Sequence, residues 1–237
     1  MKSIHLILLT SILPTLLLAQ EEAAAAPDTS LFGMIKQGGW AMFPLALCSV
    51  VMIFLVIYCY METRRSRFIP DALLPRARDA LASHDTESAS RDLAASGTVL
   101  GRGLAPALLK FRPDRPNLNK DQVETLLVEN LEAEENNVSQ WVNYLNVVAA
   151  VAPMIGLLGT VSGMISAFQT IGQGGMGRPE LLAADIGEAL ITTATGLVIG
   201  IPAMIFYFIL RNRLGHQMIQ TTQTATDLID TVDEGGE

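Results

Sequence analysis

The sequence predicts an all-α integral membrane protein with three transmembrane helices and long cytoplasmic helical extensions. Half of the 237 residues are hydrophobic and only 17% are charged. The apolar residues form long blocks and do not alternate with polar ones as in a half-buried strand. Three blocks reach the length of about 20 residues that a helix needs to cross a bilayer; they are residues 42–60, 141–171 and 181–210.

A shorter apolar block at residues 4–19 has the layout of a secretory signal peptide. Lys2 supplies an early positive charge, and Ala19 is a small residue followed by polar ones. Because the block is short for a span, cleavage is favoured over the alternative, an uncleaved first span. We expect a signal peptide at 1–19 and a short periplasmic segment at 20–40.

Basic residues follow the first and third long blocks but not the second. Arginines stand at positions 64, 65, 67, 211 and 213, whereas the connection between the second and third blocks holds only Arg178, balanced by Glu180. The positive-inside rule therefore places the N-terminus outside and the C-terminus in the cytoplasm of a multi-pass membrane protein.

This topology divides the rest of the chain into six parts. They are transmembrane helix 1 at 41–61, a cytoplasmic helical domain at 62–140, transmembrane helix 2 at 141–172, a periplasmic turn at 173–182, transmembrane helix 3 at 183–210, and a cytoplasmic C-terminal helix and tail at 211–237.

The cytoplasmic insert contains Ala- and Leu-rich segments separated by polar or Gly punctuation, which predicts helices at 70–83, 86–95 and 102–111. After a break rich in proline, Asn119 and Gln122 have the spacing of a capping box. We expect one helix from Lys120 to about Ile171, which at 1.5 Å per residue is roughly 75 Å long. The third span is expected to continue as a helix to residue 232.

Several classes of function lack support. The net charge of −8 argues against nucleic-acid binding, which draws on clustered Lys and Arg. The three histidines are scattered, and no spacing predicts a metal site, a cofactor site or a catalytic nucleophile with its base. Cys48 and Cys59 lie in the first span and are interpreted as small apolar side chains. The sequence does not indicate an enzyme.

Glu188 is the first functional candidate because it lies inside the third apolar block. A carboxylate at such a depth costs roughly 2.5 kcal/mol or more, so it normally faces a partner, a cavity or water. Asp185, Thr192 and Thr195 share a stripe with it at helical spacing. A proton or ion pathway is favoured over the alternative, a permanently protonated carboxyl that bonds structurally between protomers.

Threonines add to this polar layer. If the periplasmic turn is centred near residues 176–177, Thr160 and Thr193 stand at similar depth. Glu188 is then about 7 Å nearer the outside, from five residues of helical rise. The second span also carries hydroxyl groups at Ser162, Ser166 and Thr170.

Small residues in the two spans predict close helix packing. The spacing of small residues that lets helices approach in lipid occurs among Gly156, Gly159, Gly163, Gly196 and Gly200. Pro202 is interpreted as a kink whose freed carbonyl is satisfied by neighbouring groups.

Two motifs resemble those of the MotA/TolQ/ExbB proton channel family, and its ExbB-like branch most. The first runs from Ala152 to Met164 and is followed by Phe168; the second covers 186–197 with 201–203. The resemblance implies an inner-membrane energy transducer in which several copies, five in this family, surround a single-span partner similar to ExbD, TolR or MotB. It also implies that this partner supplies a membrane Asp and that the complex acts on a TonB-like protein.

The resemblance also implies roles for single residues. Glu188 matches the family's third-span glutamate, and Thr160 and Thr193 match its pore-lining threonines. By helical spacing Thr192 lies on the stripe of Glu188, and Thr193 borders that stripe. Asp185 departs from the ExbB-like pattern, in which a small residue is usual. This departure leaves open a modified pore entrance or another ion preference.

The expected function is that of a subunit of a proton-driven complex that energises TonB-dependent outer-membrane transport. The alternatives within the family are a TolQ-like role in envelope maintenance and a MotA-like motility stator. An alternative of another class is a membrane scaffold that conducts nothing.

Overall fold

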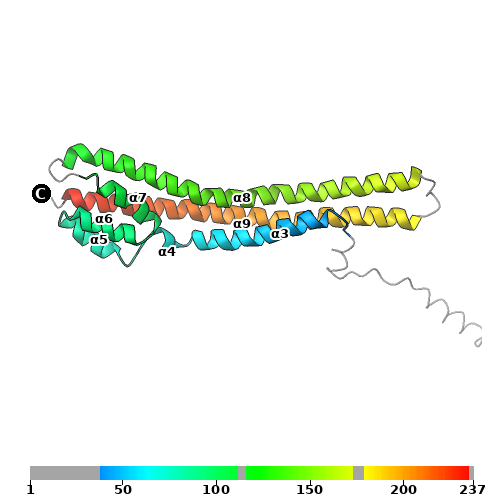
Figure 1. Cartoon of the computed structure of the whole chain (residues 1–237), viewed down its shortest axis with the longest axis horizontal. Coiled ribbons are helices and arrows are strands. Elements are labelled where there is room, and N and C mark those ends of the chain that lie inside the picture. The colour runs from blue at the N-terminus through cyan, green and yellow to red at the C-terminus, as the bar shows by residue number, and fades with distance from the viewer. Residues whose placement is uncertain (1–37, 112–115, 173–178, 235–237) are drawn as a thin grey trace, which may run out of the picture. The chain divides into compact units, whose positions relative to one another are not determined.

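The computed structural model describes residues 38–111, 116–172 and 179–234. Within these ranges the chain forms helices and no strand, which confirms the predicted all-α class (Figure 1). The helices are α3 (Met42–Glu62), α4 (Arg65–Phe68), α5 (Leu74–Ala82), α6 (Thr86–Ala95), α7 (Val99–Leu108), α8 (Pro116–Gly172) and α9 (Pro179–Glu234). The proposed signal peptide and most of the periplasmic segment lie outside the described residues.

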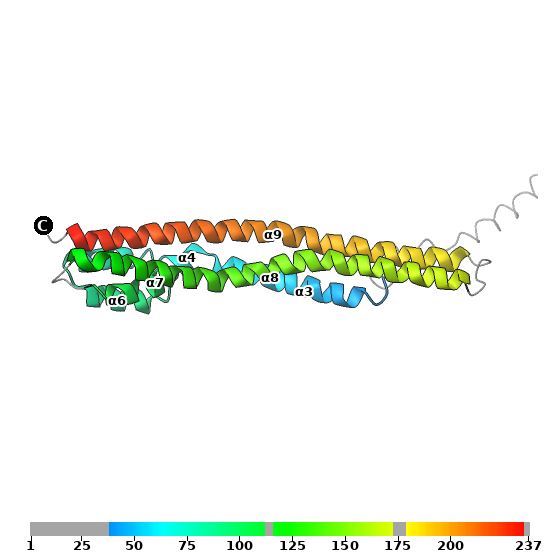
Figure 2. The ribbon, with the colours of Figure 1, turned by 90° about the horizontal axis from the view of Figure 1, so that it is seen from above.

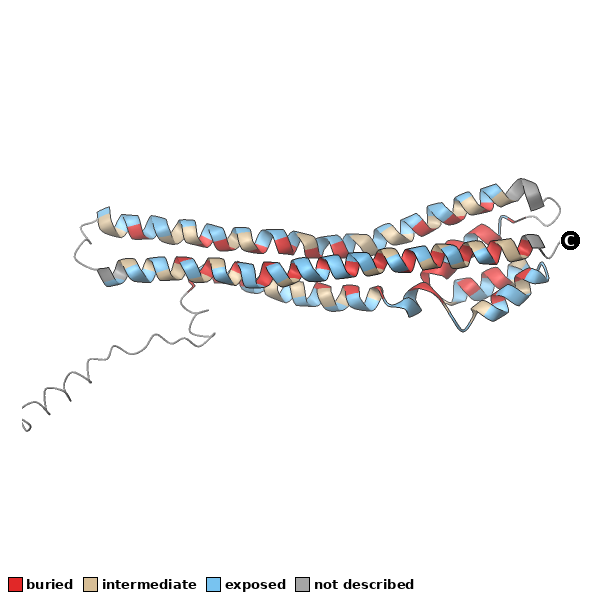
Figure 3. Ribbon diagram, turned by 180° about the vertical axis from the view of Figure 1, so that it is seen from behind, coloured by how far each residue is buried: buried red, intermediate tan, exposed pale blue. Residues whose placement is uncertain are grey.

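Three helices, α3, α8 and α9, are long and apolar enough to cross a membrane, as the sequence predicted. Many of their large apolar side chains are exposed; Phe43 is 81% exposed and Val198 is 70% exposed. Exposed and buried positions alternate along α8 and α9 (Figure 3). An apolar surface of this extent is expected where the surrounding solvent is lipid hydrocarbon.

The boundaries of α5, α7 and α8 differ by a few residues from the predicted ones. α6 occupies the predicted residues, but α8 begins at Pro116, so Asn119 lies inside the helix and its assignment as a cap is wrong. Proline is favoured at the first helical position, because its fixed φ suits a helix and its missing N–H would be unpaired there anyway.

Gly101 was interpreted as punctuation before a helix at 102–111, and this interpretation is wrong because Gly101 lies inside α7. α7 begins at Val99, where the Thr98 side chain accepts a hydrogen bond from the Gly101 backbone N–H at 3.2 Å. A Cβ atom at Gly103 would lie 2.5 Å from a methyl carbon of Leu131 in α8. Glycine is therefore retained within this helix because a neighbouring helix packs close against it.

The contacts divide the chain into two compact units. Of the described residues, the first unit contains 38–42, 159–172 and 179–192, and the second contains 43–111, 116–158 and 193–234. Each unit is considered by itself.

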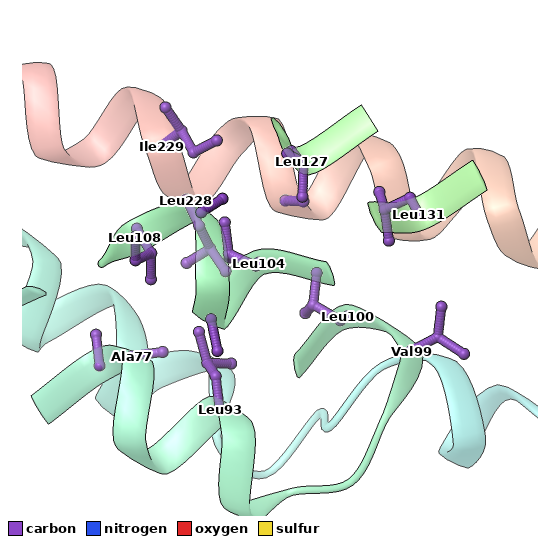
Figure 4. Close-up of a cluster of buried hydrophobic side chains, with 14 of the residues drawn as sticks. Ala77, Leu93, Val99, Leu100, Leu104, Leu108, Leu127, Leu131, Leu228 and Ile229 are labelled. Carbon is purple, nitrogen blue, oxygen red and sulfur yellow. The ribbon is translucent and has the colours of Figure 1, made fainter. Parts of the chain in front are cut away.

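The second unit contains the main apolar core, in which α5, α6 and α7 pack beside the N-terminal part of α8 and the C-terminal part of α9 (Figures 1 and 2). Leu104 of α7, Leu127 of α8 and Leu228 of α9 are essentially fully buried there. Figure 4 shows side chains from these helices meeting in one cluster. This core holds the extensions of the two long helices together outside the apolar segments.

An ion pair joins α7 to α8 at the edge of this core. Arg102 donates a hydrogen bond to Glu134 at 2.7 Å, and this bond raises the pKa of the arginine. Because Arg102 is partly exposed, the ion pair adds little stability and mainly fixes how α7 aligns with α8.

We expect Leu104→Ala to destabilise this core by about 2–5 kcal/mol, because it removes buried methyl groups and leaves a cavity. The measurement is denaturant unfolding of the purified chain in detergent, followed by tryptophan fluorescence and circular dichroism.

The matched control is Leu109→Ala. Leu109 follows the last residue of α7 and is 65% exposed, so its truncation should change the free energy of unfolding by less than about 0.5 kcal/mol. Equal losses in the two variants would contradict the assignment of this cluster as the stabilising core.

Candidate functional site

Glu188 lies in the first unit at a cavity of about 190 Å³. Asp185 lines the same cavity, because residues three apart on a helix share a face. The lining comes from the segment before α3, from α8 and from α9; it comprises Gly38, Trp40, Ala41, Gly159, Ser162, Gly163, Ser166, Asp185, Glu188 and Thr192. Both carboxyl side chains are half-buried.

The backbone before α3 lies directly against the Glu188 carboxyl group. Gly39 has a φ of 59°, and a Cβ atom built there would collide with the Glu188 side chain. Only glycine adopts this backbone conformation without a steric penalty and also leaves room for the carboxyl group. Two requirements therefore fix glycine at this position.

Trp40 ties this segment to α8. Its indole Nε1–H donates a hydrogen bond to Ser162 Oγ at 3.2 Å. The residues on either side of Trp40 are constrained as well, since Ala41 is buried and a Cβ at Gly38 would collide with the Met42 side chain. The segment thus forms a defined wall of the cavity.

Within the first unit, α8 and α9 approach each other closely at two glycines. A Cβ at Gly159 would collide with the Thr192 side chain, and one at Gly163 would lie 2.9 Å from the Ala189 Cβ. Thr192 is only 1% exposed, and its hydroxyl donates to the Ala189 carbonyl at 2.8 Å. Both glycines were predicted as packing residues, and both also line the cavity.

No basic side chain of the described residues forms an ion pair with Asp185 or Glu188. The ion pairs in the described ranges are Arg65–Asp71, Arg67–Glu62, Arg91–Glu87, Arg102–Glu134 and Lys120–Asp230. The same ranges contain no group of three or more His, Cys, Asp or Glu side chains that could hold a metal ion. The cavity thus brings together two carboxyl groups, three hydroxyl groups and an indole.

The structure brings together three of the residues that the sequence singled out for a pathway, namely Asp185, Glu188 and Thr192. Thr160 and Thr193 are not among the described residues that line the cavity. Thr160 is half-buried on α8, and Thr193 donates a hydrogen bond to the Gly156 carbonyl at 3.0 Å.

The remaining packing candidates lie in the second unit. A Cβ at Gly196 would lie 2.7 Å from the Ala152 carbonyl oxygen, and one at Gly200 would lie 2.6 Å from Pro153. Pro202 lies inside α9, which continues past it to Glu234.

Sequence reasoning did not select Trp40, Gly38, Gly39, Ser162 or Ser166 as site residues. Trp40 was not selected because it has the position of an interfacial anchor of the first span. The serines were not selected because serine is common in membrane helices. One available signal was the spacing of Gly159, Gly163 and Ser166, which places these three residues on one helix face with Ser162 beside it. No sequence pattern joins that face to residues 38–41.

Comparisons with known proteins place the chain among proton channel and transport proteins. The model of the MotA/TolQ/ExbB proton channel family matches residues 93–223. The biopolymer transport protein ExbB-like 1 of Synechocystis is 30% identical over 190 residues, which cover 77% of this chain and 71% of that protein.

Two further relatives are similar over most of their length. Biopolymer transport protein ExbB of Neisseria meningitidis serogroup A is 31% identical over 172 residues, covering 69% of this chain and 77% of that protein. Biopolymer transport protein exbB1 of Vibrio cholerae is 27% identical over 179 residues, covering 74% and 76%. With three membrane-length helices and a family match over more than half of its length, the chain belongs to the MotA/TolQ/ExbB proton channel family, whose members are bacterial inner-membrane channel and transport proteins, not enzymes.

Proposed function

We propose that the chain is the ExbB-like, proton-conducting subunit of an inner-membrane complex that is driven by the proton-motive force and energises TonB-dependent outer-membrane transport. Membership of a proton channel family supports the general function. The biopolymer transport names of the relatives favour this branch over the TolQ-like and MotA-like alternatives.

The observation that carries the proposal is Glu188 at a polar cavity without a basic partner among the described residues. An unpaired carboxylate in an apolar helix is costly, and binding a proton removes that cost. Asp185 lines the same cavity, so a proton in the cavity has two carboxyl groups to which it can bind.

The hydroxyl groups give such a proton a route. Ser162, Ser166 and Thr192 line the cavity beside the two carboxyl groups. A hydroxyl group both donates and accepts hydrogen bonds, so it can connect a carboxyl group to water. Thr160 and Thr193 are proposed to line the same pathway further along, as the resemblance to the family implies.

The complex is proposed to contain several copies of this chain, five by the family resemblance, around an ExbD- or TolR-like single-span partner that supplies a membrane Asp. A TonB-like protein receives the output. Each elementary charge that crosses 100 mV releases about 2.3 kcal/mol, enough to bias a packed helix between two positions. Proton transfer between Glu188 and the partner's Asp would couple this energy to movement.

The proposed topology places the N-terminus in the periplasm and the C-terminus in the cytoplasm. It is supported by the arginines that follow the first and third spans. In this orientation the Glu188 cavity belongs to the periplasmic half of the membrane, and protons would enter it from the side of higher proton concentration.

We expect Glu188→Gln to abolish proton conduction while the complex still assembles, because glutamine keeps the size and hydrogen bonding of the side chain but cannot titrate. Conduction is measured as cytoplasmic acidification in cells that produce the chain with its single-span partner, and assembly by size-exclusion chromatography of the purified complex. A loss of at least about tenfold is expected for removal of a required proton carrier.

The matched control is Glu180→Gln. Glu180 is exposed in the first turn of α9 and should tolerate the same chemical change. Full conduction by Glu188→Gln would contradict the channel assignment and leave the non-conducting scaffold as the function.

Gly39→Ala should displace the segment before α3 from Glu188, since the new methyl group collides with the carboxyl group and φ is positive. The left-handed conformation costs a residue other than glycine roughly 1–2 kcal/mol. We therefore expect labelling of Glu188 by a water-soluble carbodiimide, quantified by mass spectrometry, to rise by about five- to thirtyfold.

Glu180 serves as an internal reference for labelling in the same experiment. Gly187→Ala is the control variant, because a Cβ there meets nothing within 4 Å. Unchanged labelling in Gly39→Ala would show that the segment does not cover the carboxyl group.

A further inference from the structure

Two arginines in the second unit face the same aromatic ring. The guanidinium carbon of Arg213 lies 4.7 Å from the centroid of the Tyr60 ring, and that of Arg64 lies 5.6 Å from it. Arg64 follows the end of α3, whereas Arg213 belongs to α9. Two cations within 6 Å of one ring centroid both gain from its electron-rich face but repel each other.

Neither arginine has an acidic partner within the described ranges. The basic members of the ion pairs there are Arg65, Arg67, Arg91, Arg102 and Lys120. Arg213 donates from Nε to the Thr63 carbonyl oxygen at 3.1 Å, and this bond leaves its two terminal amino groups for another acceptor. Arg64 and Arg213, here called the cationic pair, thus place two positive charges beside one ring without an acidic partner in the described ranges.

The position of Tyr60 on α3 indicates which kind of anion lies near the cationic pair. α3 is an apolar helix of 21 residues, and at 1.5 Å per residue its length matches the hydrocarbon thickness of about 30 Å. Tyr60 stands at its cytoplasmic end in the proposed topology. Ile57 and Met61, within one turn of Tyr60, are 57% and 56% exposed. An apolar surface thus adjoins the cationic pair at the level where lipid phosphates lie.

We propose that Arg64, Arg213 and Tyr60 form a binding site for the headgroup of an anionic phospholipid of the cytoplasmic leaflet. The guanidinium groups bind the phosphate oxygens, for which their planar array of donors is suited. An acyl chain lies along Ile57 and Met61. A net negative headgroup is required, because a zwitterionic lipid carries a cation that the two arginines repel.

The experiment uses the full chain purified in detergent and titrated with phosphatidylglycerol or with phosphatidylcholine of the same acyl chains. Bound lipid is counted by native mass spectrometry. The wild type should bind phosphatidylglycerol preferentially. Arg64→Gln and Arg213→Gln should each weaken that binding by about fivefold, the contribution of one basic residue near an anionic lipid, and phosphatidylcholine binding should not change.

Arg76→Gln is the matched control, since it removes one exposed arginine of the cytoplasmic helix α5 and should leave lipid binding unchanged. A second arm adds inorganic phosphate to the lipid-bound chain at a concentration equal to that of the lipid. Equal binding of the two lipids, unchanged preference in both arginine variants, or displacement of the lipid by the phosphate would each overturn the proposal. Proton conduction is not measured here, so the result is independent of the function assigned to Glu188.

Discussion

The cost of holding a carboxyl group inside an apolar helix is the constraint on which the rest of this structure depends. Glu188 must meet polar groups, since hydrocarbon offers no hydrogen bonds. The first unit provides them through a cavity built from three separate segments of the chain. Close approach of α8 and α9 at Gly159 and Gly163 brings the hydroxyl groups of α8 within reach of the acidic face of α9.

The same constraint explains the unusual backbone before α3. A side chain at position 39 would occupy the space of the Glu188 carboxyl group, and the indole of Trp40 binds Ser162 close by. The polar groups of this short segment are thus directed toward the cavity, not toward lipid.

The apolar core of α5, α6 and α7 with α8 and α9 has a different physical basis and a complementary role. Membrane helices gain little from burying apolar groups against one another, because lipid is equally apolar. In water the burial of Leu104, Leu127 and Leu228 is strongly favourable. The second unit can therefore hold the extensions of α8 and α9 firmly, while their apolar parts rely on glycine contacts such as Gly196 against Ala152.

The sequence by itself determined the helical class and the three membrane-length helices, because long apolar blocks are local properties of the chain. It also singled out Glu188 as a candidate functional residue, because a carboxyl group within such a block is equally local. It also placed Asp185 and Thr192 on the same stripe, since helical spacing fixes a face. Only the tertiary structure decided which groups meet that stripe. Trp40 and Ser162 are 122 positions apart, and the roles of Gly39 and of the glycines inside α7 depend on atoms that approach from distant segments, which no local pattern encodes.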